Sequence, residues 1–182
     1  MMEEINVLSA GERFSFKGFD WITLGHTEDG GVLAIMANCW KEIPFDDKRD
    51  YSNNYAKSTL RKTLLEELLP VLGEENLLPH VVDLVADNGD DRYGTVTDKV
   101  FILTCDEYRK YRKHVPLLDE WMWTATPWWI DPHAGTGSHV RLVRPAGTLN
   151  NDDANHSLGV APACVFNPRH LKLRRQAQMV EE

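Results

Sequence analysis

Two adjacent tryptophans and a group of short polar side chains are the residues of this sequence best suited to contact another molecule. Trp128 and Trp129 lie in a segment rich in proline and glycine. Indole rings supply large, flat contact areas, and short polar side chains direct hydrogen bonds, as in binding surfaces built from loops. The polar residues that we assign to this candidate site are Asp131, His133, His139, Arg141, Asn150, Asn151, Asp152, Asp153, Asn155 and His156. Their chemistry would be stacking and hydrogen bonding, which suits a sugar or a protein surface.

These residues meet only if two loops leave a sheet at the same end. The segments that alternate or run apolar, and that we therefore predict as strands, are 120–126, 139–143, 148–150 and 158–166. The loops between them are 127–138 and 151–157. Pro145 and Gly147 in the sequence Arg-Pro-Ala-Gly suit the second and fourth positions of a type I turn. Because that turn adds one reversal of the chain, it predicts that the two loops converge.

The tryptophans themselves allow two interpretations. Trp121 and Trp123 are two residues apart on a predicted strand, so they share a face, and we expect both in the core. Trp128 and Trp129 follow Pro127, and for them burial in the core and presentation at the surface stay open. Runs of Asn and Asp are also typical of turns without any binding role.

Motifs for catalysis and for metal binding are absent from the sequence. It contains no HExxH, no GxSxG and no complete phosphate-binding glycine motif. Cys39, Cys105 and Cys164 have no CxxC spacing, and we expect them to be small buried residues. His133 and His139 are potential metal ligands, although two histidines in a loop are more often ordinary polar residues. We therefore expect no catalytic residue, no metal and no cofactor.

The remaining elements that position this site are short strands and two helices. The residues from Ser58 carry leucines at helical spacing, with Ser58 as N-cap and Pro70 as a stop or bend. A second helix follows the capping box formed by Thr104 and Glu107. Further strands are predicted at 13–16, 21–26, 32–37 and 99–104, and 77–86 is a strand or a short helix. This order predicts an α+β fold that is largely antiparallel. We expect one domain over 1–168 and a polar tail or short helix over 169–182.

Composition and charge limit the classes of partner that we expect for this protein. The 182 residues carry a formal net charge of −8, whereas general nucleic-acid binding needs a basic surface. No apolar run reaches the roughly 18 residues of a membrane span, and the acidic N-terminus lacks a signal-peptide pattern. We therefore expect synthesis in a cytoplasm, no nucleic-acid partner and no insertion into a membrane. Release by lysis or in a virus particle stays open, as does a homo-oligomer.

Five phrases in a fixed order resemble an uncharacterised domain family common in Firmicutes and their phages. They are "FKGFDWITL", "STLRKTLLEELL", "TDKVFILTCDEYRKY", "WTATPWW" and "GVAPACVF", and together they span roughly residues 11–167. The C-terminal half of that family is similar to C-type-lectin-like folds, including formylglycine-generating enzymes and the variable proteins of diversity-generating retroelements. Two arginines of the family pattern are missing here, at Ala161 and within "WTATPWW".

The resemblance implies a C-type-lectin-like domain that binds a protein or glycan through its C-terminal loops. A phage or bacterial receptor-binding or adhesion protein is the expected setting. The Glu-Pro-Asn and Trp-Asn-Asp triplets of calcium-dependent lectins are absent. Retroelement diversification favours Asn, Asp, His and Ser near the C-terminus, which fits "NNDDANHS". An enzyme or accessory domain that uses cysteine or metal, and a structural assembly subunit, are the alternatives.

Overall fold

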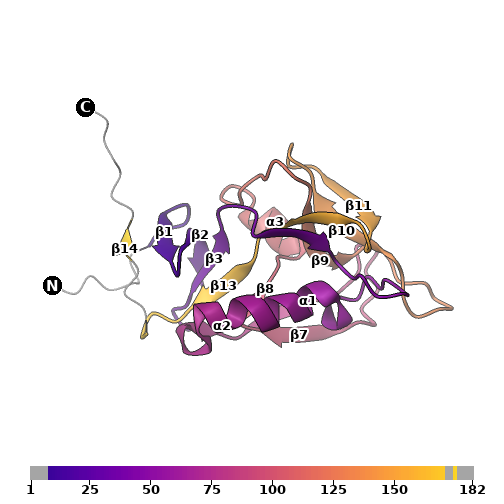
Figure 1. The fold of residues 1–182 in the computed structure, drawn as a ribbon, viewed down its shortest axis with the longest axis horizontal. Helices are drawn as coiled ribbons and strands as arrows, with labels where there is room; N and C mark the ends of the chain where they lie inside the picture. The colour runs from indigo at the N-terminus through magenta and orange to yellow at the C-terminus, as the bar shows by residue number, and fades with distance from the viewer. Residues whose placement is uncertain (1–7, 171–173, 176–182) are drawn as a thin grey trace.

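The protein is a mixed α+β structure whose strands are mostly antiparallel, as the order of its elements predicts. The computed structural model describes residues 8–170 and the backbone of 174–175. Figure 1 shows two main sheets side by side, with one helix running along the edge of the molecule below them. Among the described residues, every strand pair is antiparallel except β9 with β12.

The first sheet contains the beginning and the end of the chain. Its main path runs in the order β14-β1-β2-β3-β13-β5, and β8 also pairs with β13. The strands are β1 (Arg13–Phe16), β2 (Phe19–His26), β3 (Val32–Met36), β5 (Leu77–Leu78), β8 (Val100–Phe101), β13 (Ala163–Phe166) and β14 (Arg174–Arg175). The strands predicted at 13–16, 21–26 and 32–37 are thus confirmed, and they form an antiparallel meander. Of the predicted tail, Arg174 and Arg175 form a strand, and the other residues beyond 170 lie outside the described part.

The second sheet carries the candidate site. Its order is β11-β10-β9-β12-β4. The strands are β4 (Lys41–Pro44), β9 (Met122–Pro127), β10 (His139–Val143), β11 (Leu149–Asp153) and β12 (Ser157–Val160). A separate two-stranded ribbon pairs β6 (His80–Asp83) with β7 (Thr95–Asp98). The segment 77–86, predicted as a strand or a short helix, contains two strands, β5 and β6, which are separated by Pro79, a residue with no backbone N–H to donate to a ladder.

One long helix and one short one complete the fold. The long helix consists of α1 (Thr59–Thr63), a π-helical turn (Leu64–Leu68) and α2 (Leu69–Leu72). Ser58 caps it as predicted, by accepting a hydrogen bond from the N–H of Arg61. The helix passes through Pro70 rather than stopping there. The π turn, in which Leu69 N–H bonds to Leu64 O, widens the helix just before the proline that lacks an N–H.

The short helix, α3 (Cys105–Tyr111), packs on β9. Both halves of its predicted capping box are formed between Thr104 and Glu107. The backbone N–H of Cys105 donates to Thr126 Oγ1 of β9 at 2.9 Å, and Tyr108 donates to the carbonyl of Gly147 at 2.8 Å. The helix therefore holds both β9 and the turn that follows β10.

Large aromatic side chains fill the space around the sheets. Phe14, Phe16 and Trp21 all pack edge-on against the ring of Phe166. Trp123 is fully buried against Phe45, and its indole N–H donates to the carbonyl of Ile43. These contacts confirm the prediction that Trp123 belongs to the core.

For Trp121 the prediction of a core position is wrong. Its side chain is 37% exposed and lies under the guanidinium of Arg144, 5.1 Å from the ring centre. Strand β9 begins at Met122, so Trp121 lies just before it. The side chain of Trp121 is therefore outside the alternation that would place it on the same face as Trp123.

No helix in the described part of the chain has the length and apolar character needed to cross a membrane.

Candidate functional site

The convergence of the two loops is confirmed by the register of the β10–β11 hairpin. Arg144 and Gly147 close a turn in which Gly147 N–H bonds to Arg144 O at 2.8 Å. Gly147 has a φ of +82°, a conformation that glycine adopts without strain. The hairpin pairs His139 with Asp153, so loop 128–138 and the turn at 154–156 leave the sheet together. They lie at the end of the molecule away from the termini (Figure 1).

Trp128 and Trp129 present their side chains at this end. They are 40% and 37% exposed, whereas the next residue, Ile130, is buried. The Trp128 ring lies 5.5 Å from the imidazole of His139, tilted by 47°, and its backbone N–H donates to His139 O at 3.0 Å. The choice that the sequence left open is thus resolved in favour of surface presentation. We call these two residues the tryptophan pair.

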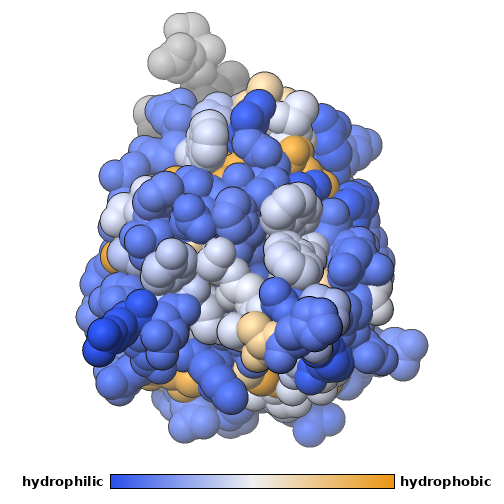
Figure 2. Space-filling view, turned by 90° about the vertical axis from the view of Figure 1, so that its right-hand side faces the viewer, coloured by the Kyte–Doolittle hydropathy of each residue, from blue (hydrophilic) through white to orange (hydrophobic). Residues whose placement is uncertain are grey.

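The surface around the pair is mainly polar. Figure 2 views this end of the molecule and shows mostly hydrophilic residues, with only small and separate hydrophobic areas. A large apolar patch, which would indicate a permanent protein interface, is therefore not what this face offers. Aromatic rings among hydrogen-bonding groups are the arrangement present.

His139 links the pair to the edge strand. The side-chain amide of Asn151 donates to His139 Nδ1 at 2.9 Å, and His139 Nε2 lies 3.1 Å from Asp153 Oδ1. Because Nδ1 accepts, the proton of the neutral imidazole is on Nε2, the nitrogen next to the Asp153 carboxylate. His139, Asn151 and Asp153 therefore form one connected set beside Trp128.

Strand β11 extends to Asp153, whereas the predicted strand ended at residue 150. The polar residues 151–153 are therefore strand rather than loop. Strand β10 supplies the hydrogen bonds that draw these poor strand formers into β11. Alternation along β11 then divides the predicted site between two faces. Asn151 and Asp153 are on the face of His139, whereas Asn150 and Asp152 are paired with the buried Leu142 and Val140.

Asp131 and Arg141 serve the structure around them. Asp131 accepts hydrogen bonds from the N–H groups of His133 and Ala134, and these, Ala134 first, lower the pKa of its carboxyl group. Arg141 is largely buried beneath the sheet surface, with Nε 3.5 Å from a carboxylate oxygen of Asp87. Both residues belong to the scaffold of the site.

The other predicted residues of the two connecting segments are exposed. His133 lies in loop 128–138, and Asn155 and His156 lie in the turn after β11. His156 reaches back to the strand, with Nδ1 2.8 Å from Asp152 Oδ1.

Asn53 holds loop 128–138 in place, a role that the sequence did not indicate. Its side chain is fully buried and donates to the carbonyls of Trp129 and His139, both at 2.9 Å. Its Oδ1 accepts from Tyr93 at 2.6 Å, and its backbone N–H donates to Gly137 O. Nothing in the polar segment around Asn53 distinguishes it from a surface asparagine, because its side-chain partners lie 40 to 86 residues away in the sequence.

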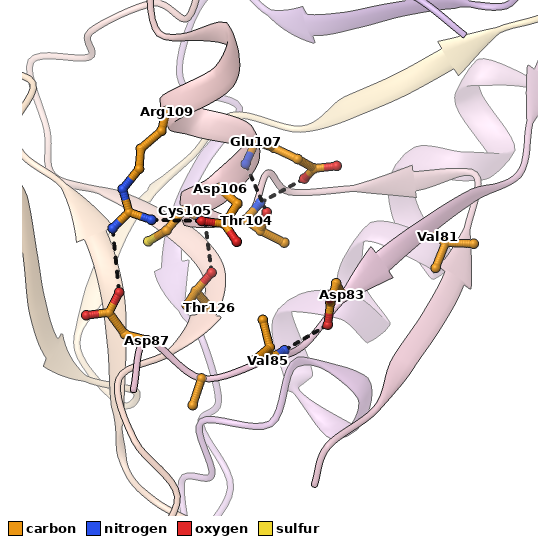
Figure 3. Close-up of a pocket in the computed structure, with 11 residues that line it drawn as sticks. Val81, Asp83, Val85, Asp87, Thr104, Cys105, Asp106, Glu107, Arg109 and Thr126 are labelled. Carbon is orange, nitrogen blue, oxygen red and sulfur yellow. Dashed lines mark hydrogen bonds and ion pairs between the residues drawn. The ribbon is translucent and has the colours of Figure 1, made fainter. Parts of the chain in front are cut away.

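A pocket of about 280 Å³ lies on the other side of β9, near the start of α3. Figure 3 shows Arg109 above it, directed toward Asp87 and Asp106, with Asp83 and Val85 on the opposite wall. Each carboxylate has a local partner: Asp83 caps Val85 N–H, Glu107 contacts His80, and Arg109 contacts the other two. The carboxylates of this pocket are thus already paired with other groups of the protein.

The cysteines have the environment of buried structural residues. Burial raises the pKa of the Cys105 and Cys39 thiols and raises that of Cys164 well above its ordinary value. A raised pKa disfavours the thiolate that nucleophilic or metal chemistry requires. The alternative of a cysteine-dependent enzyme therefore gains no support from the three thiols.

Searches against protein-family models, curated proteins and solved structures each find no match to this chain. The assignment of a function consequently rests on the geometry of the site.

Proposed function

We propose that this protein is a non-catalytic ligand-binding domain with a C-type-lectin-like fold. Its expected setting is a phage or bacterial receptor-binding or adhesion protein. The observation that carries the proposal is the exposed tryptophan pair, of which Trp128 lies beside His139 and its neighbours Asn151 and Asp153. The ordered phrases that resemble those of the Firmicutes and phage family, together with the α+β and mostly antiparallel fold, support the finer assignment.

The ligand that suits this surface is a glycan, with a protein surface as the alternative. Sugars present apolar faces that stack on indoles and hydroxyl groups that bond to amides and carboxylates. Trp128 and Trp129 supply the rings, while Asn151 and Asp153 supply donors and acceptors whose directions are set by His139. Because each such site is small, display in several copies would raise the effective affinity.

The contacts that hold loop 128–138 in place support recognition over catalysis. Asn53 ties the carbonyls on either side of the exposed indoles to the buried part of the molecule. A surface that is ordered before binding loses less conformational entropy when it binds. The described residues of the site bring together no nucleophile with an adjacent base.

Binding to glycan arrays and to bacterial cells tests the proposal. We expect Trp128→Ala and Trp129→Ala each to weaken binding by about 2 kcal/mol, roughly thirtyfold, as truncation of a central tryptophan does. Trp121→Ala is the matched control, since Trp121 is equally exposed but lies at the other end of β9, about 20 Å away along the strand. Equal losses in all three variants would contradict the proposal.

The diversification hypothesis has its own test. Asn150 to Asp153 occupy an edge strand, and Asn155 and His156 an exposed turn, where substitution disturbs little packing. Comparison of the same locus among closely related genomes should show substitutions clustered in this segment. Substitutions spread evenly through the gene would contradict diversification without affecting the binding proposal.

A further inference from the structure

We propose that Asp152, Asp153 and His156 bind a divalent transition-metal ion such as Zn²⁺. Each residue offers one ligand atom, and these atoms all lie within 4.8 Å of one another. Carboxylate oxygen and imidazole nitrogen are both established ligands of zinc, at bond lengths of about 2.0–2.2 Å. The metal site shares Asp153 with the proposed glycan-binding surface, but zinc binding can be measured without any glycan, so the two proposals can fail separately.

The turn after β11 brings the three side chains together. The strand ends at Asp153, and the N–H of His156 then bonds to the carbonyl of Asp153 at 3.1 Å. This reversal returns the imidazole to the end of the strand, where its Nδ1 lies 2.8 Å from Asp152 Oδ1. Two ligands of a tetrahedral zinc ion lie about 3.4 Å apart. A metal can therefore replace the shared proton after a small rotation of the exposed His156 side chain.

The charge around the two aspartates favours a cation. No Lys or Arg within residues 8–170 forms an ion pair with Asp152 or Asp153, and their charged partners are the imidazoles of His156 and His139. Elsewhere in the same part of the chain, arginines pair with aspartates, as Arg61 does with Asp98 and Arg92 with Asp90. The two adjacent carboxylates therefore have no guanidinium or ammonium group of the described residues paired with them. A divalent ion would supply a positive charge.

A supporting contact orients one of the ligands. His139 Nε2 lies 3.1 Å from Asp153 Oδ1, and Asn151 holds the imidazole ring by donating to its Nδ1. Polar groups that contact the ligating residues are a regular feature of metal sites and help to orient the ligands. The opposite oxygen of Asp153 is left for a metal. Three protein ligands leave a fourth position for water or for an oxygen of a bound molecule.

Calorimetric titration of the full chain with zinc chloride tests the site. We expect one ion per chain, and loss of that binding in the double variant Asp153→Asn, His156→Ala. His139→Ala should weaken binding by about tenfold, as loss of a group that supports a metal ligand does. His26→Ala is the matched control, because His26 is an exposed histidine at the end of β2, outside the cluster and outside the candidate site, and it should leave the affinity unchanged.

Cys39 offers the competing explanation for bound zinc, since it is the one cysteine with partial exposure. Cys39→Ser should retain the ion. Absence of stoichiometric binding in the wild type, binding unchanged in the double variant, or loss of binding in Cys39→Ser alone would each overturn the proposal. Circular dichroism of every variant separates loss of the site from loss of the fold.

Discussion

At the scale of single residues, Asp131 shows how an expected ligand contact can belong to the scaffold. Its carboxylate accepts two backbone hydrogen bonds within loop 128–138, first from Ala134 and then from His133. A charged acceptor is a better partner for these N–H groups than a protonated one, which is why the pKa is lowered. The carboxylate thus keeps the loop in shape just after the tryptophan pair.

The lowered pKa predicts how loop 128–138 responds to acid. A group whose pKa is lower in the folded state stabilises that state above its unfolded value of about 4, and the contribution is lost as the pH falls through the folded pKa. We expect the fluorescence of the tryptophan pair to change below about pH 4. Asp131→Asn keeps an oxygen acceptor that does not titrate, so the change should be smaller in that variant. Identical acid titrations of the two proteins would contradict this role.

Exposure of the tryptophan pair is directly measurable. Acrylamide should quench Trp128, Trp129 and Trp121 and, in part, the half-buried Trp40, whereas Trp21 and Trp123, which are almost fully buried, should be protected. The double variant Trp128→Phe, Trp129→Phe should therefore lose a large part of the quenchable emission in a protein shown to be monomeric. An unchanged quenchable fraction would mean that the indoles are covered, as in a structural subunit.

At the scale of elements, Asn53 and Gly137 act together to attach loop 128–138 to the second sheet. A Cβ atom on Gly137 would lie 2.5 Å from the carbonyl oxygen of Trp129 and 2.7 Å from Asn53 Nδ2. Only glycine allows this approach, so the residue is required for space and not for an unusual φ. The sequence shows a glycine in a loop, but it does not show what the glycine must avoid.

Two substitutions test this attachment. Gly137→Ala should destabilise the protein by about 1–3 kcal/mol through the steric overlap, and Asn53→Ala by a similar amount through the buried carbonyls left without donors. Chemical denaturation measures both changes. Asn155→Ala, at an exposed turn residue, is the control and should stay within about 0.5 kcal/mol of wild type. Near-neutral behaviour of Asn53→Ala would show that the loop is held by other contacts.

At the scale of the whole molecule, the cysteines report on the integrity of the fold. Cys164 lies on β13, which pairs with β3, β5 and β8, and it is completely buried. Cys105 is the first residue of α3, and its side chain is buried against Thr124 of β9. Burial raises the pKa of both thiols, so reagents that need a thiolate should reach neither before the structure opens.

Thiol labelling of the native protein should therefore detect Cys39 alone. We expect one slowly reacting thiol in buffer and three in denaturant, and none in the native Cys39→Ser variant. Rapid labelling of Cys164 in the folded protein would contradict its burial. That result would instead revive the hypothesis of a cysteine-dependent enzyme.

Features that depend on neighbours in the chain could be predicted from the sequence. The Ser58 cap, the capping box of Thr104 and Glu107 and the turn closed by Gly147 each form within a few residues, so their signals are local. The α+β class and the convergence of the two loops followed from counting such elements. The predicted convergence of the loops also placed Trp128 and Trp129 beside short polar side chains.

Features that depend on distant partners were decided by the tertiary structure. Trp121 is exposed because β9 pairs only from Met122, and β11 extends to Asp153 because β10 supplies its hydrogen bonds. Asn53 reaches the tryptophan loop across more than 75 residues of sequence. Local propensity indicates where most helices, strands and turns lie, but pairing between strands sets the extent of β11, and its register determines which side chains share a face. For this protein, that register separates the residues beside the tryptophan pair from those that only lie near them in sequence.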